Sequence, residues 1–336
     1  MARGTAPSLP TRGLRRARLF AGVLLLLPSA LVLSECSRDE DPTPAPSQAT
    51  VEQAPLNGSV VMIGAGDIAV CDRNRDEQTA HLVDSLLKAE DAARTQSVVV
   101  TIGDNAYPSG SRGVENDFPR CFSPSWGKGR IMERIRPSPG NHDYDSGSLQ
   151  PYIDFFGKKA GPNGGSYYSF DVGDWHVISL DSELYYLDDG HAKQNAQEKW
   201  LRNDLAANRK QCALAYFHRP LFSSGQYGAT RRMKGLWDAL YSAGADIVLN
   251  GHEHHYERFT AQNPDGRSDS RNGIVEFIVG TGGAQLRGVD HVVDNSAAQI
   301  RGRYGVLKLT LGKGEYQHAF IDISGRVWDA GSGRCH

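Results

Sequence analysis

The sequence predicts an α/β domain over residues 59–336, built around a largely parallel β-sheet. Apolar, β-branched runs alternate there with segments of helical periodicity, which is the pattern of βαβ units. The first unit comprises a strand at 60–64, a helix at 76–90 and a strand at 97–103. No internal repeat and no linker divides the segment, so we expect a single domain.

The later elements are predicted in the same way. Two β-rich runs, 167–171 and 175–181, flank Gly173-Asp174 and predict a hairpin. An extended segment is expected to begin near Ile131. The remaining predictions are helices at 197–208 and 231–243 and strands at 213–217, 246–250, 275–279 and 304–311, with a turn at 312–314.

The first 58 residues differ in composition from the domain. Several arginines precede an apolar run from Leu19 to Leu33, which is the profile of an export signal. The run contains Pro28 and is shorter than the roughly 20 apolar residues that a membrane-spanning helix needs. We therefore expect residues 1–36 to be a signal peptide or lipoprotein leader, and residues 37–58, rich in Pro and acidic side chains, to be an unstructured linker.

The removal of the leader has more than one interpretation. Leu33-Ser34-Glu35-Cys36 is similar to a lipoprotein box, although Glu35 stands where a small residue is usual, and it would place a lipid anchor at Cys36. Ordinary cleavage after Ser34 is the alternative, and Arg15-Arg16 also permits a twin-arginine signal. All three predict an exported protein that is secreted, periplasmic or held at the cell surface.

Charge and cysteine content narrow the class of protein further. The chain has 37 Lys and Arg against 39 Asp and Glu, a balance that does not indicate a nucleic-acid partner. The cysteines of the domain do not have the spacing of a zinc ribbon or of a Cys-x-x-Cys redox centre, so we expect disulfides. Three pairings are possible, and the preferred one joins Cys71 to Cys121 and Cys212 to Cys335.

Polar side chains follow the predicted strands at the points where the strands end. Ligands bind outside the carboxyl ends of the strands in open α/β sheets, so we expect these loops to meet in one crevice. The side chains are carboxylates, imidazoles, an amide and a phenol, the types that bind hard and borderline metal ions. They are Asp67, Asp104, Tyr107, Asn141, His142, His218, His252 and His254.

Each of these residues also has a plainer interpretation. Asp104 and Asn141 could cap turns, and the closely spaced histidines could lie in a solvated loop. Residues 64–69 also match the dinucleotide pattern G-x-G-x-x-A, but Asp67 inside that loop would repel a pyrophosphate. His252 and His254 lie two residues apart, which on an extended segment places them on one side and His255 on the other.

In these residues the sequence resembles the calcineurin-like metallophosphoesterases and, among them, compact single-domain bacterial purple acid phosphatases. The resemblance spans about residues 59–336, and it implies a four-layer α/β/β/α sandwich with two mixed β-sheets. Ala69 stands where the family usually has glycine. The five blocks appear in order as Gly66-Asp67-Ile68-Ala69, Gly103-Asp104-Asn105-Ala106-Tyr107, Gly140-Asn141-His142-Asp143, Ala215-Tyr216-Phe217-His218 and Gly251-His252-Glu253-His254.

The resemblance also implies two metal ions that share Asp104 as a bridging ligand. The first set of ligands is Asp67, Asp104, Tyr107 and His254, and the second is Asp104, Asn141, His218 and His252. The first set is the more anionic and suits Fe(III), whereas the second suits a divalent Fe, Zn or Mn ion. An iron–phenolate bond at Tyr107 would give a violet or pink colour.

The activity implied is hydrolysis of small phosphate monoesters by water activated at the two metals. His142 would be the general acid, with Asp143 orienting its ring, and His142, His255 and Arg219 would contact the phosphoryl group. Segments 182–191 and 227–232 are expected to form pocket walls. The alternatives are a phosphodiesterase or nucleotide phosphatase with the same site, and an exported protein that binds metal or phosphate without turnover.

Overall fold

The computed structural model describes residue 56 and residues 58–336, apart from 108–117, 188–190 and 290. The predicted leader and almost all of the predicted linker lie outside the described residues. Among the helices that are described, none has the length and apolar character needed to cross a membrane.

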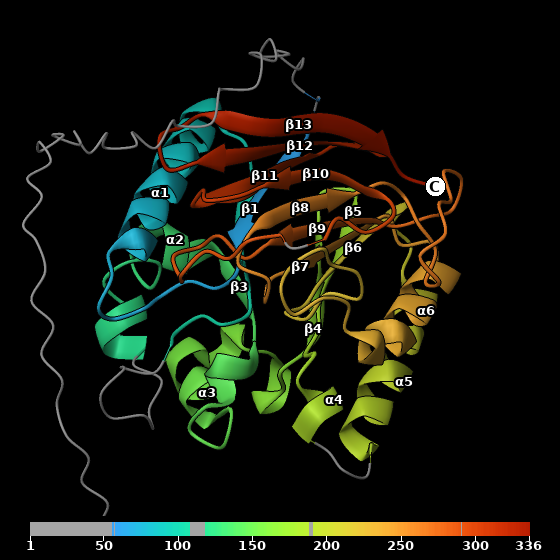
Figure 1. Cartoon of the computed structure of the whole chain (residues 1–336), viewed down its shortest axis with the longest axis horizontal. Coiled ribbons are helices and arrows are strands. Elements are labelled where there is room, and N and C mark those ends of the chain that lie inside the picture. Colours follow the sequence, from blue (N-terminus) through green and yellow to red (C-terminus); the bar gives the residue numbers. More distant parts are fainter. Residues whose placement is uncertain (1–55, 57, 108–117, 188–190, 290) are drawn as a thin grey trace, which may run out of the picture. The chain divides into compact units, whose positions relative to one another are not determined.

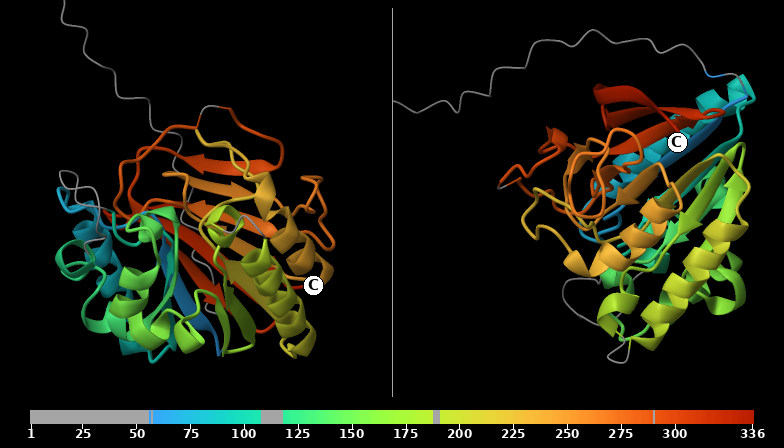
Figure 2. Two further views of the ribbon diagram at one scale, coloured as in Figure 1. Left: turned by 90° about the horizontal axis from the view of Figure 1, so that it is seen from below. Right: turned by 90° about the vertical axis from the view of Figure 1, so that its right-hand side faces the viewer.

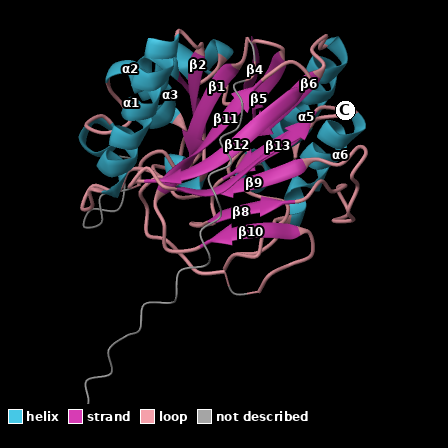
Figure 3. Ribbon diagram, turned by 90° about the horizontal axis from the view of Figure 1, so that it is seen from above, coloured by secondary structure: helices cyan, strands magenta, loops and turns pink. Residues whose placement is uncertain are grey.

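Two mixed β-sheets lie between helices, as the sequence resemblance implied (Figures 1 and 3). In the described part of the chain, one sheet has six strands in the order β13-β12-β11-β1-β2-β3, and the other has seven in the order β10-β8-β9-β7-β6-β5-β4. The strands are β1 Val60–Ala65, β2 Ser97–Ile102, β3 Ile135–Ser138, β4 Tyr168–Val172, β5 Trp175–Ser179, β6 Cys212–Tyr216, β7 Ile247–Asn250, β8 Tyr256–Phe259, β9 Val275–Val279, β10 Ser296–Ile300, β11 Gly305–Leu311, β12 Glu315–Asp322 and β13 Val327–Arg334.

Helices cover the outer faces of the two sheets. Helices α1 and α2 contact strands of the six-stranded sheet, and α5 and α6 lie along the seven-stranded sheet (Figure 2). The α-helices are α1 Arg75–Ala93, α2 Gly129–Arg134, α3 Gln150–Phe156, α4 Leu184–Leu187, α5 Ala192–Ala207 and α6 Lys234–Ser242. Short turns of tighter helix are found at Asn141–Tyr144, Gly157–Lys159, Pro162–Gly164 and Arg231–Met233.

Strand β6 shows how side-chain alternation produces the layers. Leu214 and Tyr216 belong to the apolar core that the two sheets share, whereas Ala213 and Ala215 belong to the core under α5 and α6. Successive side chains of a strand point to opposite faces, so a strand buried on both faces is apolar throughout. This explains why the run 213–217 reads as continuously apolar in the sequence.

Most predicted elements are confirmed, with shifts at their ends. β1 and β2 are parallel and joined through α1, and β4 and β5 form the predicted hairpin. The expectation of a largely parallel sheet holds for β1-β2-β3 and β5-β6-β7-β9, while the other strands pair antiparallel. The segment from Ile131 is not extended at its start, because α2 continues to Arg134 and β3 begins at Ile135.

Both preferred disulfides are confirmed. Cys71 is bonded to Cys121, with the Cα atoms 4.7 Å apart, and Cys212 is bonded to Cys335, with the Cα atoms 5.4 Å apart. The second bond joins the end of β13 to the start of β6 across the two sheets, over a sequence separation of 123.

Candidate functional site

The polar residues that follow the strands do converge, although they come from both sheets. Asp67 follows β1 and Asp104 follows β2 in the six-stranded sheet, and His218 follows β6 in the seven-stranded sheet. Ligand-type atoms of these three side chains lie within 4.8 Å of one another, and all three side chains are buried. These side chains therefore come together where parallel strands of both sheets end.

The loops that carry these residues have unusual backbone geometry. Asp67, Asp104 and His252 have φ values of 59°, 50° and 69°, in the left-handed region that non-glycine residues rarely adopt. Such conformations persist only where the surrounding structure enforces them, and they cluster at functional sites. Gly103 has a φ of 76°, and a Cβ atom there would overlap the His218 ring, so this position requires glycine.

One group of contacts joins Asp67, Tyr107 and His254. Tyr107 Oη lies 3.0 Å from Asp67 Oδ1 and 3.2 Å from His254 Nε2, and His254 Nε2 lies 3.0 Å from the same Asp67 oxygen. The other ring nitrogen of His254, Nδ1, lies 2.6 Å from the carbonyl oxygen of Gln285. A hydrogen bond donated from Nδ1 leaves the Nε2 lone pair directed into the cluster, which is the usual arrangement of a metal-binding histidine.

A second group joins Asp104, His218 and His252. His218 Nε2 lies 3.3 Å from Asp104 Oδ2 and 3.2 Å from His252 Nδ1, while His218 Nδ1 lies 2.9 Å from the carbonyl oxygen of Ile102. Tyr107 Oη lies 3.2 Å from Asp104 Oδ2. The carboxylate of Asp104 thus contacts both groups.

The charges in the cluster depend on one another. Burial alone would raise the pKa of Asp104, but the charge of His218 and its hydrogen bond hold that pKa well below its usual range. Conversely, burial would lower the pKa of His218, and Asp104 raises it to about 10. Burial, with the positive charges of His218 and Arg219, lowers the pKa of His252 to about 2.

The side chains of the cluster are suited to bind metal ions. The side-chain oxygen of Asn141 is buried and has no hydrogen-bond partner among the described residues, which is costly unless a ligand satisfies it. Burial and the negative charges of Asp67 and Asp104 raise the pKa of Tyr107 well above its ordinary value, so a phenolate there requires a nearby cation. Carboxylate, imidazole, amide and phenol groups are together the ligands expected for hard and borderline metals.

His142 lies beside the cluster with its ring partly exposed. Its backbone N–H donates to Asp104 Oδ1 at 2.8 Å, and its ring Nε2 lies 3.9 Å from Asp104 Oδ2. Its Nδ1 lies 2.6 Å from Asp145 Oδ2. Asp145 was missed in the sequence, although its position three residues after His142 was an available signal.

Asp143 lies beneath the turn that follows β3. Its buried carboxylate accepts hydrogen bonds from the backbone N–H of Gly140, at 2.8 Å, and from the side-chain amide of Asn105, at 2.9 Å. Asp143 therefore fixes the turn that carries Asn141 and His142. The ring of His142 itself is held at Nδ1 by Asp145.

Arg219 borders the cluster next to His252. Its Nη1 lies 3.1 Å from His252 Nε2, and its Nε donates to both carboxylate oxygens of Glu183, at 2.8 and 3.0 Å. The guanidinium also lies over the Tyr186 ring, 4.3 Å from its centroid. Glu183 and Tyr186 belong to the segment 182–191 expected to form a pocket wall.

Tyr227, from the second expected wall, lies on the other side of His252. Its ring is stacked on the His252 ring, with centroids 4.9 Å apart, and Arg287 lies 4.4 Å from the Tyr227 centroid. Glu253 holds this loop in place, because its carboxylate accepts hydrogen bonds from the backbone N–H groups of Tyr227 and Gly228, at 2.7 and 2.8 Å. The structure thus gives Glu253 and Arg287 positions at the site that the sequence did not indicate.

His255 is not part of the cluster. It is 1% exposed, and its Nε2 lies 3.1 Å from the carboxylate of Glu257. This agrees with the alternation that places His255 opposite His254.

Comparison with known proteins agrees with this geometry. The family model described as calcineurin-like phosphoesterase matches residues 52–256. Human acid phosphatase type 7 is 29% identical over 259 residues, which cover 66% of this chain and 56% of that protein. Purple acid phosphatase 18 of Arabidopsis thaliana is 32% identical over 169 residues, which cover 45% of this chain and 37% of that protein.

The fold has close counterparts among solved structures. A purple acid phosphatase from yellow lupin seeds superposes with a TM-score of 0.60 at 18% identity, covering 83% of this chain and 54% of that chain. At this identity the match shows the fold alone. The alignments span about half, or less, of the length of the curated relatives named above.

Proposed function

Because the chain belongs to the calcineurin-like phosphoesterase family, we propose that it is a metal-dependent phosphatase that hydrolyses phosphate monoesters, of the purple acid phosphatase type. The observation that carries the proposal is the pair of ligand groups that share Asp104. The acid phosphatase relatives, at about 29% identity, support the same reaction class and imply a dinuclear metal centre.

The proposed ligands follow the two groups of contacts. Asp67, Tyr107 and His254 would hold Fe(III) together with Asp104. The same Asp104 would hold a divalent Fe, Zn or Mn ion with His218 and His252 of the second group, and Asn141 would add its unpartnered side-chain oxygen. Two cations bound there would lower the pKa of a bound water and neutralise charge on the phosphoryl oxygens.

The remaining roles belong to the residues around the ligands. We assign His142 the donation of a proton from Nε2 to the leaving oxygen, because its Nδ1 is held by Asp145 and its ring is partly open to solvent. Arg219 would bind a phosphoryl oxygen, since the bifurcated hydrogen bond from its Nε to Glu183 fixes the guanidinium beside His252.

Export is part of the proposal. The described domain contains two disulfides. Disulfides persist in oxidising compartments and are rare in cytosolic proteins. Together with the leader-like first 36 residues, they support a protein that is secreted, periplasmic or held at the cell surface.

The test is hydrolysis of p-nitrophenyl phosphate and of bis(p-nitrophenyl) phosphate by the purified protein, with the metal content measured on the same sample. Faster turnover of the monoester supports the proposal. Faster turnover of the diester would make the protein a phosphodiesterase that uses the same residues. A folded, metal-loaded protein that cleaves neither ester would be the binding protein considered as an alternative.

A further inference from the structure

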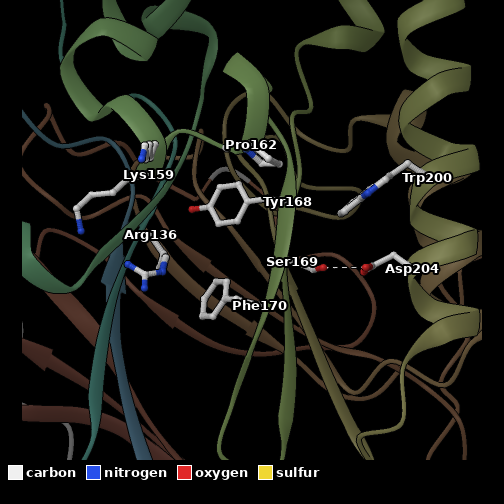
Figure 4. Close-up of a pocket in the computed structure, with 10 residues that line it drawn as sticks. Arg136, Lys159, Pro162, Tyr168, Ser169, Phe170, Trp200 and Asp204 are labelled. Atoms are coloured by element: carbon white, nitrogen blue, oxygen red, sulfur yellow. Dashed lines mark hydrogen bonds between the residues drawn. The ribbon is translucent and has the colours of Figure 1, made fainter.

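A cavity of about 830 Å³ is lined by residues of β3, β4 and α5 and of the loop between β3 and β4 (Figure 4). It is found where the edge strand of one sheet, β3, lies near the edge strand of the other, β4, and α5 forms its far wall. The two short helices Gly157–Lys159 and Pro162–Gly164 contribute the rest of the lining. This volume is within the range of small-molecule sites, and none of the candidate metal ligands lines the cavity.

Three cations line this cavity: Arg136, Lys158 and Lys159. In the described structure Arg136 donates to the carbonyl oxygen of Ile135, and Lys159 donates to the carbonyl oxygen of Glu133, at 2.9 and 3.0 Å. Neither cation forms an ion pair with a described carboxylate. Burial, with the neighbouring charge of Arg136, lowers the pKa of Lys159, and the charge of Glu133 offsets this effect only in part.

The one carboxylate in the lining is already bonded elsewhere. Asp204 accepts a hydrogen bond from Ser169 Oγ at 2.8 Å, and its second oxygen lies 2.8 Å from His176 Nε2. Figure 4 shows Ser169 and Asp204 on one side of β4 and Arg136 and Lys159 on the other. No carboxylate among the lining residues therefore pairs with these cations in the described structure.

Flat apolar surfaces complete the cavity. Phe170 lies under Arg136, with the guanidinium carbon 5.5 Å from its centroid. Trp200 is half-buried against Tyr167, with ring centroids 4.9 Å apart, and Figure 4 shows it across β4 from the cations, with Pro162 between. A ligand that fills the cavity would thus meet positive charge at one end and flat carbon surface at the other.

We propose that this cavity binds a small organic anion with a flat apolar group, placing its negative end at Arg136, Lys158 and Lys159 and its flat part against Pro162 and Trp200. An anion at this position relieves the repulsion among the cations, and an Arg guanidinium suits a planar or bidentate anionic group such as a carboxylate or sulfonate. The site is separate from the proposed phosphatase function and does not depend on it.

The probe for this site is naphthalene-2-sulfonate, which carries a flat ring and a negative charge but no phosphate and no bond that a phosphatase cleaves. Binding is measured by titration calorimetry on the full-length protein in saturating inorganic phosphate, which occupies a phosphate-binding metal site. We expect the probe to bind, and we expect the uncharged naphthalene-2-sulfonamide to bind at least about tenfold more weakly.

The variants distinguish the effect of removing a charge at the cavity from the effect of unfolding the protein. Arg136→Gln is expected to weaken probe binding about tenfold, Arg136→Lys less, and Trp200→Leu severalfold, with phosphate-ester hydrolysis unchanged. Lys313→Gln, in the turn after β11, is the matched control and should bind like the wild type. Equal binding of the sulfonamide, binding that is unchanged in Arg136→Gln, displacement by phosphate, or no binding up to about 10 mM would each overturn the proposal.

Discussion

The imidazole of His142 is held by Asp145: Nδ1 of the ring lies 2.6 Å from Oδ2 of the carboxylate. This contact fixes the ring and leaves Nε2 toward the cluster, so replacing Asp145 should impair proton donation without removing metal. We expect Asp145→Ala to lower kcat by roughly tenfold to a hundredfold, with Asp145→Asn intermediate. The measurement is steady-state hydrolysis with metal analysis, and Asp174→Asn, in the β4–β5 turn, is the control. An unchanged kcat in Asp145→Ala would contradict the assignment.

Tyr107 provides a spectroscopic test of the first ligand group. Its Oη lies 3.0 Å from Asp67 and 3.2 Å from Asp104, so Tyr107→Phe removes one phenol oxygen and leaves the ring in place. We expect the violet absorption of an iron–phenolate bond to disappear and the iron content to fall. Tyr144→Phe, whose hydroxyl bonds to Asp181 outside the cluster, should keep the colour. Retention of the band in Tyr107→Phe would exclude this phenol as the ligand.

Glu183 is predicted to act through Arg219. Glu183→Gln keeps the size of the side chain but removes the charge that holds the guanidinium at 2.8 Å. We expect KM for a monoester to rise about threefold to tenfold with a smaller change in kcat, because Arg219 is assigned to substrate binding. The control is Glu198→Gln, because Glu198 accepts a hydrogen bond from Tyr185 in the same pocket wall. If KM does not change, Arg219 is not positioned by Glu183.

His176 should make stability depend on pH. Burial opposes its charged form, but Asp204 and Asp171 raise its pKa above the ordinary value. The charged ring therefore stabilises the folded state fully below the unfolded pKa of about 6.5, and this contribution is lost as the pH rises through the folded pKa. The gap in unfolding free energy between wild type and His176→Gln should be larger at about pH 5.5 than at about pH 9, by urea denaturation. A gap that widens toward high pH would show the opposite sign.

The sequence predicts the central strands of the two sheets and the ligand cluster better than the strands at or next to the sheet edges. The run 275–279 is apolar except for Glu276, and its predicted bounds match β9. In contrast, β8, β10 and β13 were not predicted, because their strands are rich in polar or small residues: Glu257 and Arg258 lie in β8, and glycines interrupt β13. These strands depend on pairing with neighbours that are distant in the sequence.

The candidate site likewise contains residues that the sequence indicates and residues that it does not. The ligand-type residues could be found because each follows a strand and each is of a recognisable chemical type. The supporting residues were harder to find. Asp145 had only its spacing from His142 as a signal, and Glu183 and Glu253 are ordinary acidic residues until the fold brings them to Arg219 and the Tyr227 loop. Burial of His255 likewise becomes clear only when the carboxylate of Glu257 is placed beside it.

The most direct test of the proposed dinuclear site is to compare the wild-type protein with Asp104→Asn for metal content and monoester hydrolysis. Asp104 contacts both ligand groups, so the account predicts that the variant binds fewer than two metals per chain and that hydrolysis falls by at least about a hundredfold. The melting temperature of the metal-free proteins shows that both are folded. Full metal content and undiminished hydrolysis in Asp104→Asn would contradict the account.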